Sequence, residues 1–227
     1  MSIRSHSLRP ALILLAAVIV VVGPLYFASL RPGYSHIANT ISELGETGAP
    51  RARLVAYGFF LPVGLMVWLA LWLIQRGRPD QEASAILLAL SCLGTGYVVS
   101  AFAPCDPGAP LFGSWRTLVH NAAGLIDYGG TGVGFILVAR RQTKKGAATQ
   151  AAGFVVAGAS CLVCLVLLLP VFHIRGGVQR VVEVIQFTGV FFACRLLSKQ
   201  LPPDWRPAQD AGTGRQFAIR KPEILRQ

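Results

Sequence analysis

Long apolar runs separated by short polar stretches recur along the chain and set its fold class. A helix that crosses a hydrocarbon core of about 30 Å needs about 20 mostly apolar residues, because each residue adds about 1.5 Å and lipid cannot hydrogen bond to open amides. The pattern predicts an all-α, polytopic membrane protein with a six-helix transmembrane bundle over residues 10–198. The expected spans are 10–30, 54–75, 83–103, 116–139, 151–172 and 178–198.

Composition supports a lipid bilayer as the surroundings of this chain. Of 227 residues, 53% are hydrophobic and only 14% are charged, which lies outside the usual range of soluble domains. The first apolar run follows Arg4 and Arg9 like a signal peptide, but it is long for such a segment and no A-x-A cleavage site follows. We therefore expect it to be retained as a helix. The net charge of +11 comes from clusters between apolar runs rather than from one polar face, so it indicates no nucleic acid partner.

The basic residues are distributed unequally between the two sides of the predicted bundle. Short loops rich in Lys and Arg stay in the cytoplasm, and with an N-in, C-in orientation 15 of the 21 basic residues face that side. The prediction is a multi-pass protein of the inner cell membrane with a cytoplasmic N-terminus, 1–9, and a flexible basic tail, 199–227. The bias toward Ala, Gly and Arg favours a bacterial source. The outward six are Arg31, Arg51, Arg53, Arg116, Arg175 and Arg180.

Two polar stripes run into the predicted spans. In the fourth span, His120 and Asp127 are seven residues apart and share one helix face. In the sixth, Gln179, Glu183 and Gln186 recur at spacings of four and three and form one polar edge. A carboxylate in hydrocarbon is costly unless paired, protonated or hydrated, so both acids should face the bundle interior. Candidate partners are Arg116, Arg180, His120, Ser91 and Thr95.

These stripes and the outer loops together predict an outward-facing polar cavity that recognises a lipid headgroup, a small molecule or protons. An internal network that only holds the helices in register explains the same residues, and both interpretations stay open. The candidate residues are Glu43, Asp106, His120, Asn121, Asp127, Gln179, Glu183 and Gln186.

A metal-dependent lipid hydrolase is the alternative. His36, His120 and His173 fall on the outer side, where they and nearby carboxylates could hold zinc and activate water. The sequence has no HExxH, GxSxG or Walker motif. Cys161 and Cys164 form a CxxC within an apolar run, which is typical of small packing residues.

A non-catalytic assembly or scaffold protein is a third hypothesis. Gly130 and Gly134 in the fourth span have small-xxx-small spacing, which favours close helix contacts within the chain or in a homo-oligomer.

In the first outer loop, Asn39 or Thr40 is expected to cap a short surface helix that ends at Gly45.

Three motifs carry a resemblance to a known family. They are ISELGETGAP before RARLVAYGFFLPVG, then FAPCDPG, then RTLVHNAAGLIDY. In this order the chain resembles the prokaryotic membrane family catalogued as domain of unknown function 998, over about residues 10–198. The first motif is also similar to a loop of the Frag1 and DRAM group of six-helix proteins. The resemblance implies fold and topology and supplies no reaction. The matching positions are Ile41, Ser42, Leu44, Gly45, Asp106, Pro107, Gly108 and His120.

Overall fold

The computed structural model describes residues 3–77 and 79–200, and every regular element in this part of the chain is helical. The predicted tail from residue 201 onward lies outside the described residues. Within them, six helices are long and apolar enough to cross a membrane, which confirms the six-helix membrane fold. The elements are α1 Ile3–Ser29, η1 Ser42–Gly45, α2 Ala52–Val55, η2 Ala56–Phe60, α3 Leu61–Gln75, α4 Gln81–Phe102, α5 Trp115–Lys144, α6 Ala148–Leu167 and α7 Arg175–Ser198.

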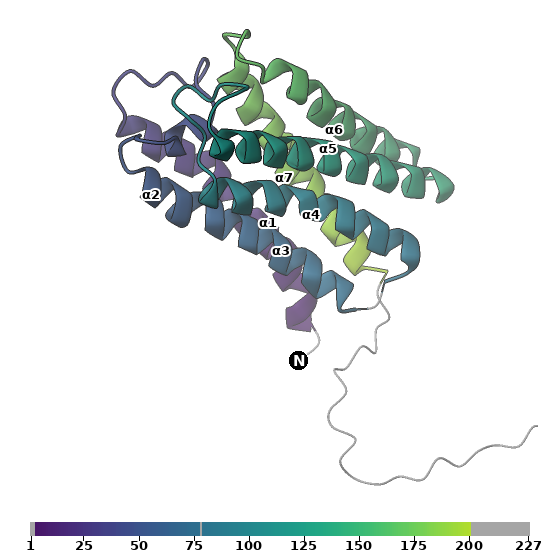
Figure 1. Ribbon diagram of the computed structural model, residues 1–227. Coiled ribbons are helices and arrows are strands. Elements are labelled where there is room, and N and C mark those ends of the chain that lie inside the picture. The colour runs from purple at the N-terminus through teal and green to yellow at the C-terminus, as the bar shows by residue number, and fades with distance from the viewer. Residues whose placement is uncertain (1–2, 78, 201–227) are drawn as a thin grey trace, which may run out of the picture.

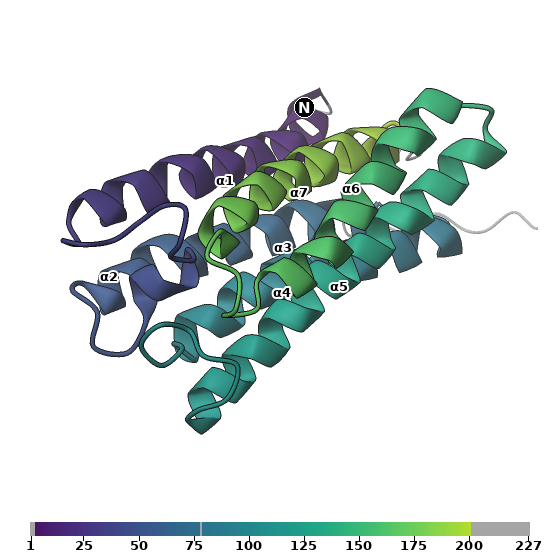
Figure 2. The same cartoon turned by 90° about the horizontal axis from the view of Figure 1, so that it is seen from above.

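The crossing helices run alongside one another as a bundle (Figures 1 and 2), and their contacts close it into a ring around a common core. The second crossing helix is continuous through α2, the π-helical turn η2 and α3. From it the chain packs α3 on α4, α4 on α5, α5 on α6 and α6 on α7, and α1 closes the ring against α7 and α3. Each neighbour in the ring is thus a neighbour in sequence except where α1 meets α7.

The outer surface of the ring is apolar. Leu14, Val18 and Leu25 of α1 and Val163 and Val166 of α6 are each about half exposed, and many other aliphatic side chains share this exposure. Water would make such a surface costly, whereas hydrocarbon would not. The exposed apolar faces therefore suggest a bilayer environment.

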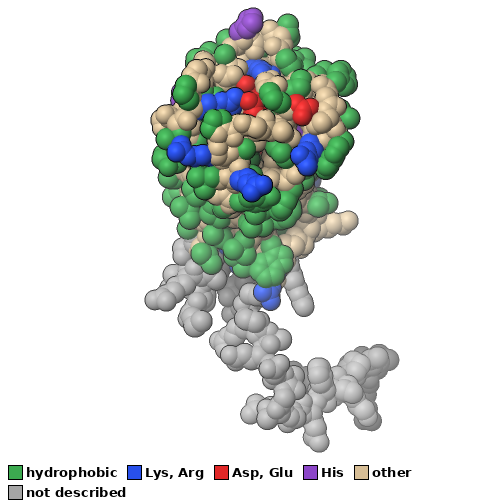
Figure 3. Space-filling model, turned by 60° about the vertical axis from the view of Figure 1, so that its left-hand side comes forward, with side chains coloured by type: hydrophobic (Ala, Val, Ile, Leu, Met, Phe, Trp, Pro, Cys, Tyr) green, Lys and Arg blue, Asp and Glu red, His purple; other side chains and the backbone are tan. Residues whose placement is uncertain are grey.

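Two ends of the bundle differ in structure. The loop end carries the connections 30–51, 103–114 and 168–174, and the terminal end carries the N-terminus of α1 and the short turns 76–80 and 145–147 (Figure 1). Figure 3 looks toward the loop end, where acidic side chains lie among basic ones within a rim of hydrophobic residues.

Two helix ends differ from the expected spans. α5 continues to Lys144 instead of ending near 139, because its last turns are held at the terminal end by ion pairs from Arg141 and Lys144. α6 ends at Leu167 instead of continuing to 172. Pro170 lacks an N–H and disfavours helical geometry in the residue before it, so the chain turns there.

The glycines of α5 bring neighbouring helices close together within the chain. An added Cβ at Gly130 would overlap Cys92, and one at Gly134 would overlap Leu90, both on α4. On the opposite side, Gly132 meets the backbone of Gly158 on α6. The predicted small-residue contacts therefore serve α4–α5 and α5–α6 packing, while homo-oligomerisation stays a prediction.

Candidate functional site

Glu43 fastens the first loop over the loop end. Its side chain is 2% exposed and accepts hydrogen bonds from the Thr40 N–H (2.8 Å) and the Asn39 amide (2.6 Å). It also pairs with Arg175 at the start of α7, with 3.0 Å between Oε1 and Nη2. The expected surface helix is a buried 3-10 turn, η1, without a side-chain cap. Glu43 instead reaches back to the Thr40 N–H.

A second buried acid, Glu46, joins the first loop to the 103–114 loop. Its Oε2 accepts from the Gly108 N–H (2.7 Å), and its Oε1 pairs with Arg31. Gly108 has a φ of +77°, which glycine adopts without steric cost. The Gly108 carbonyl in turn accepts from Arg175 at 2.7 Å. The Asp-Pro-Gly turn therefore belongs to the same network as Glu43.

Arg180 anchors the other side of the first loop. Its Nη1 donates to the carbonyls of His36 (2.9 Å) and Asn39 (3.0 Å), and its Nη2 donates to the Tyr34 hydroxyl (2.7 Å). The Gly177 N–H adds a bond to a loop carbonyl. Burial raises the pKa of Tyr34, and burial together with the charge of Arg180 lowers the pKa of His36.

Asp106 positions the start of α5. Its carboxylate accepts from the Ser114 N–H (2.7 Å) and hydroxyl (2.9 Å), and these bonds hold the pKa of Asp106 below its usual value. Its N–H donates to Thr117 Oγ1. In the preceding residue, burial and two nearby glutamates raise the pKa of Cys105 to about 12, so its thiol stays protonated.

Deeper in the bundle, Glu183 of α7 is held between two tyrosines. It is 3% exposed; Oε2 accepts from the Tyr97 hydroxyl of α4 (2.8 Å) and Oε1 from the Tyr128 hydroxyl of α5 (2.7 Å). A tyrosine buried among apolar groups needs such a partner for its hydroxyl. Three helices therefore meet at one carboxyl group.

Asp127 of α5 lies beside this group. Its Oδ1 accepts from Gln186 Nε2 at 3.2 Å, and it is near enough to Glu183 for the two carboxyl groups to interact electrostatically. Its side chain packs directly on Gly96 of α4, where no larger residue fits. The spacing in α5 and α7 had indicated that both acids face inward, and they do.

The basic partners expected for these acids are engaged elsewhere. Arg180 donates to the first loop, and Arg116 lies over the Trp115 ring. His120 Nδ1 lies 2.9 Å from the Ala103 carbonyl. Because a carbonyl only accepts, Nδ1 must carry the hydrogen and Nε2 of the neutral ring is an acceptor. In the described part of the chain, no Lys, Arg or His hydrogen bonds to either buried acid.

Gln179 connects the loops with the buried acids. Its Oε1 accepts from the Ile41 N–H (2.7 Å), and its Nε2 donates to the Tyr128 hydroxyl (3.2 Å). A shift of the first loop would therefore be felt at the tyrosine that holds Glu183.

Two neighbouring spaces that share lining residues lie around this glutamine. The loop-end pocket has a volume of about 400 Å³ between α5, the end of α6 and the loops. The acid cavity, of about 40 Å³, lies beneath it and is lined by Asp127, Glu183 and Tyr97 among others. The residues common to both are Ser42, His120, Gly124, Tyr128 and Gln179.

The structure brings together most of the predicted site residues. His120, Asn121, Asp127, Gln179 and Glu183 line one or both spaces. Gln186 contacts Asp127 without lining them, and Glu43 acts through Arg175, which lines the pocket. Asp106 lines neither space and holds the start of α5 instead.

The histidines named as metal ligands do not form a metal centre. His120 is buried, whereas His173 is exposed and His36 packs against Tyr34. Among residues 3–77 and 79–200, no group of three or more His, Cys, Asp and Glu side chains is arranged to hold a metal ion. The described residues therefore supply no assembled ligand set for zinc.

Sequence reasoning assigned no role in this site to Tyr97, Tyr128 and Arg175, and it named Ser42 only as a motif position. Both tyrosines carried a usable signal, because a hydroxyl within a span needs a polar partner. Arg175 gave no such signal, because the expected sixth span began after it. Its position over the pocket depends on how the loops fold.

Comparison with known families agrees with the resemblance seen in the motifs. A family model described as "Protein of unknown function (DUF998)" matches residues 14–207. No curated protein and no solved structure matches the chain. In the structure the three motifs meet at the loop end: Ser42 and His120 line the pocket, and Gly108 bonds to Arg175 beside it.

Proposed function

The chain belongs to the DUF998 family of proteins of unknown function, and from this premise we propose that it binds an uncharged, hydroxyl-bearing amphiphile in the loop-end pocket. The observation that carries the proposal is the division of this pocket into an apolar wall and a polar end. A volume of about 400 Å³ lies in the usual range of small-molecule sites.

The apolar wall comes mainly from two of the lipid-facing helices, α5 and α6. Leu125 of α5 and Leu165 of α6 line it, together with Leu168 and Leu169 just after α6. Leu125 is also 61% exposed at the outer surface of the ring. A hydrocarbon chain could therefore lie along this wall and continue into the bilayer.

The polar end offers hydrogen bonds without spare charge. Arg175 is the ionised side chain of the lining, and Glu43 already balances its charge. Asn121 Oδ1 and the Ser42 hydroxyl have no hydrogen-bond partner in the described residues, and His120 Nε2 is an acceptor. Hydroxyl groups match these atoms, whereas a phosphate is bound best by uncompensated Arg or Lys.

The site faces outward in this proposal. The loop end bears six basic residues, of which Arg31 and Arg175 are paired with acids, while most of the Lys and Arg residues belong to the other side. This distribution supports cytoplasmic termini in a bacterial cell membrane. The pocket would then take its ligand from the outer leaflet.

Matched lipids test the headgroup chemistry. We expect dioctanoylglycerol, at 100 times its Kd, to stabilise the protein in nanodiscs against thermal unfolding by about 2.7 kcal/mol. Dioctanoyl phosphatidic acid, which has the same chains and a phosphate in place of the hydroxyl, should stabilise it less. Equal or stronger stabilisation by the phosphatidic acid would contradict the proposal.

A pair of glycines on α5 provides the control for location. Open space surrounds the Cβ position of both Gly124 and Gly129, but only Gly124 lines the pocket. Gly124→Leu should abolish the stabilisation by dioctanoylglycerol, and Gly129→Leu should retain it. The same response in both variants would place the binding elsewhere.

A further inference from the structure

The acid cavity contains two buried carboxyl groups whose charge the proposed amphiphile binding does not explain. Asp127 and Glu183 are 5% and 3% exposed and lie in the middle of membrane-crossing helices. Two ionised carboxyl groups side by side there are costly unless a positive charge compensates at least one of them. Hydrogen bonds from Tyr97 and Tyr128 offset part of the cost of an ionised Glu183. Since no described Lys, Arg or His bonds to either acid, the charge of Asp127 must be compensated by a small cation or a proton.

The hydrogen bonds in the cavity favour a proton. Both oxygens of Glu183 already accept tyrosine hydroxyls, the pattern of a carboxylate, and the Gln179 carbonyl oxygen accepts the Ile41 N–H. What remains is Asp127 Oδ2, the hydroxyls of Ser42 and Ser100 in the cavity lining, and Gln186 Oε1 beside it, none with a described partner. These are too few oxygens for the six or so ligands of a bound hard cation.

The titratable groups around the pair are neutral ones from three helices. Tyr97 and Cys92 belong to α4, Tyr128 and His120 to α5, and Cys161 and Cys164 to α6. None supplies a fixed positive charge. The proton balance of the cavity therefore depends mainly on the two acids.

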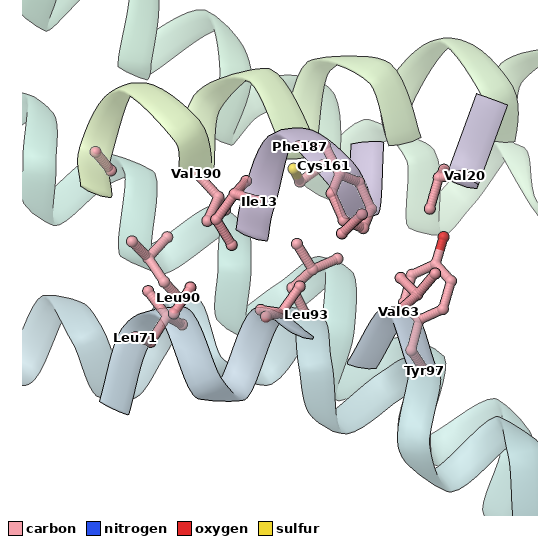
Figure 4. Packing of buried hydrophobic residues seen from close by; sticks show 14 of the residues in the cluster. Ile13, Val20, Val63, Leu71, Leu90, Leu93, Tyr97, Cys161, Phe187 and Val190 are labelled. Carbon is pink, nitrogen blue, oxygen red and sulfur yellow. The ribbon is translucent and has the colours of Figure 1, made fainter. Parts of the chain in front are cut away.

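Access to the cavity is one-sided. Through Ser42, His120 and Gly124 it adjoins the loop-end pocket, and its volume of about 40 Å³ exceeds the 10–15 Å³ that one water needs. Toward the terminal end, Leu93, Val190 and Phe135 are fully buried in the hydrophobic core. Figure 4 shows Leu93 and Val190 displaced from Tyr97 in the direction of Leu90 and Leu71.

We propose that Asp127 is a proton-binding site that exchanges with the loop-end pocket and not with the terminal end. A hydronium ion in the cavity transfers its proton to the Asp127 carboxylate, an O–H bond forms, and a water molecule is left behind. Glu183 remains the carboxylate held by Tyr97 and Tyr128. This site goes beyond amphiphile binding and does not depend on it.

Infrared spectroscopy of the protein in nanodiscs tests the protonated state. The wild type at neutral pH should show the C=O band of a carboxylic acid, and Asp127→Asn should lose it. Asp106→Asn removes a half-buried loop carboxylate outside the cavity and should leave the band unchanged. If Asp127→Asn does not fold, Asp127→Glu should keep the band at a shifted frequency.

Two outcomes would overturn the assignment of the proton. One is a wild-type spectrum without the band at neutral pH. The other is stabilisation by sodium chloride but not choline chloride that disappears in Asp127→Asn, which would make sodium the bound cation.

Deuterium exchange tests the route. On transfer to D₂O the Asp127 band should shift as the acid exchanges its proton. Gly124→Leu, which fills the junction between pocket and cavity, should slow this shift by on the order of tenfold, the effect of about 1.4 kcal/mol on a barrier. Gly129→Leu should leave the rate unchanged. Equal rates in the two variants would rule out entry through the pocket.

Discussion

At the scale of single residues, the ion pair between Glu43 and Arg175 joins the first loop to the start of α7. Both side chains are almost fully buried, at 2% and 11% exposure, so neither charge is solvated if the other is removed. Glu43→Gln should destabilise the folded protein by about 3–5 kcal/mol, because it leaves the guanidinium with carbonyl partners alone. Thermal unfolding in detergent measures the loss.

The double variant Glu43→Gln with Arg175→Met separates charge from packing. It should be more stable than Glu43→Gln alone, since no buried charge is left unpaired. Arg116→Gln removes an exposed arginine at the same end and should change stability by no more than about 0.5 kcal/mol. If the double variant were the less stable of the two, packing rather than charge would explain the effect.

Single residues also show how far the sequence predicts the candidate site. Asp127 and Glu183 were predictable because hydrocarbon forces isolated acids inward, and helical spacing gives the face on which they lie. Their hydrogen-bond partners were not predictable. Tyr97 and Tyr128 lie on two other helices, and the sequence of one span does not show how its helix is rotated relative to its neighbours. Arg180 was expected near the acids, but it is drawn to loop carbonyls that exist only once the first loop has folded.

At the scale of elements, the start of α4 combines a helix cap with an ion pair in one side chain. Asp80 Oδ1 accepts from the Ala83 N–H (2.8 Å) and Asp80 Oδ2 pairs with Arg141 of α5 (2.6 Å). Asp80→Asn keeps the cap and should cost about 0.2–1 kcal/mol, since the aspartate is 57% exposed. Asp80→Ala loses the cap as well and should cost about 0.5–2 kcal/mol more.

The charge part of this effect depends on pH in a definite direction. The hydrogen bond from Arg141, followed by that from Ala83, lowers the pKa of Asp80 in the folded protein. Its stabilisation is thus present above the unfolded pKa of about 3.9 and is lost as the pH falls through the folded value. The stability difference between wild type and Asp80→Asn should shrink in acid. A difference that grew in acid would show that the pair does not stabilise the fold.

The number of membrane-crossing helices was predicted better than the residues at which they begin and end. Six spans follow from hydropathy alone, because lipid admits only long apolar helices here. The extension of α5 to Lys144 depends on Asp80 and Glu82, which lie about 60 residues away in sequence. The turn η1 was expected on the surface, yet Glu43 and Leu44 are buried in it, because its ion-pair partner begins another helix.

At the scale of the whole molecule, the two ends of the bundle differ in the length of their connections and in how their charged residues are paired. At the loop end, charged side chains form ion pairs with one another or hydrogen bonds to backbone carbonyls. The terminal end instead carries Lys and Arg residues on short turns such as 145–147. Positively charged short loops are retained in the cytoplasm during insertion. By this rule the proposed amphiphile pocket and the proposed proton route would both open on the outer side of the membrane.

This placement predicts which residues an impermeant thiol reagent reaches in intact cells. Phe112 is 78% exposed at the loop end, and Lys145 is exposed at the terminal end. In a variant without the native cysteines, Phe112→Cys should be labelled in intact cells and Lys145→Cys only after permeabilisation. The control for access is labelling of both after permeabilisation. The reverse pattern would put the pocket in the cytoplasm, where the inner leaflet would have to supply its ligand and the cytoplasm its protons.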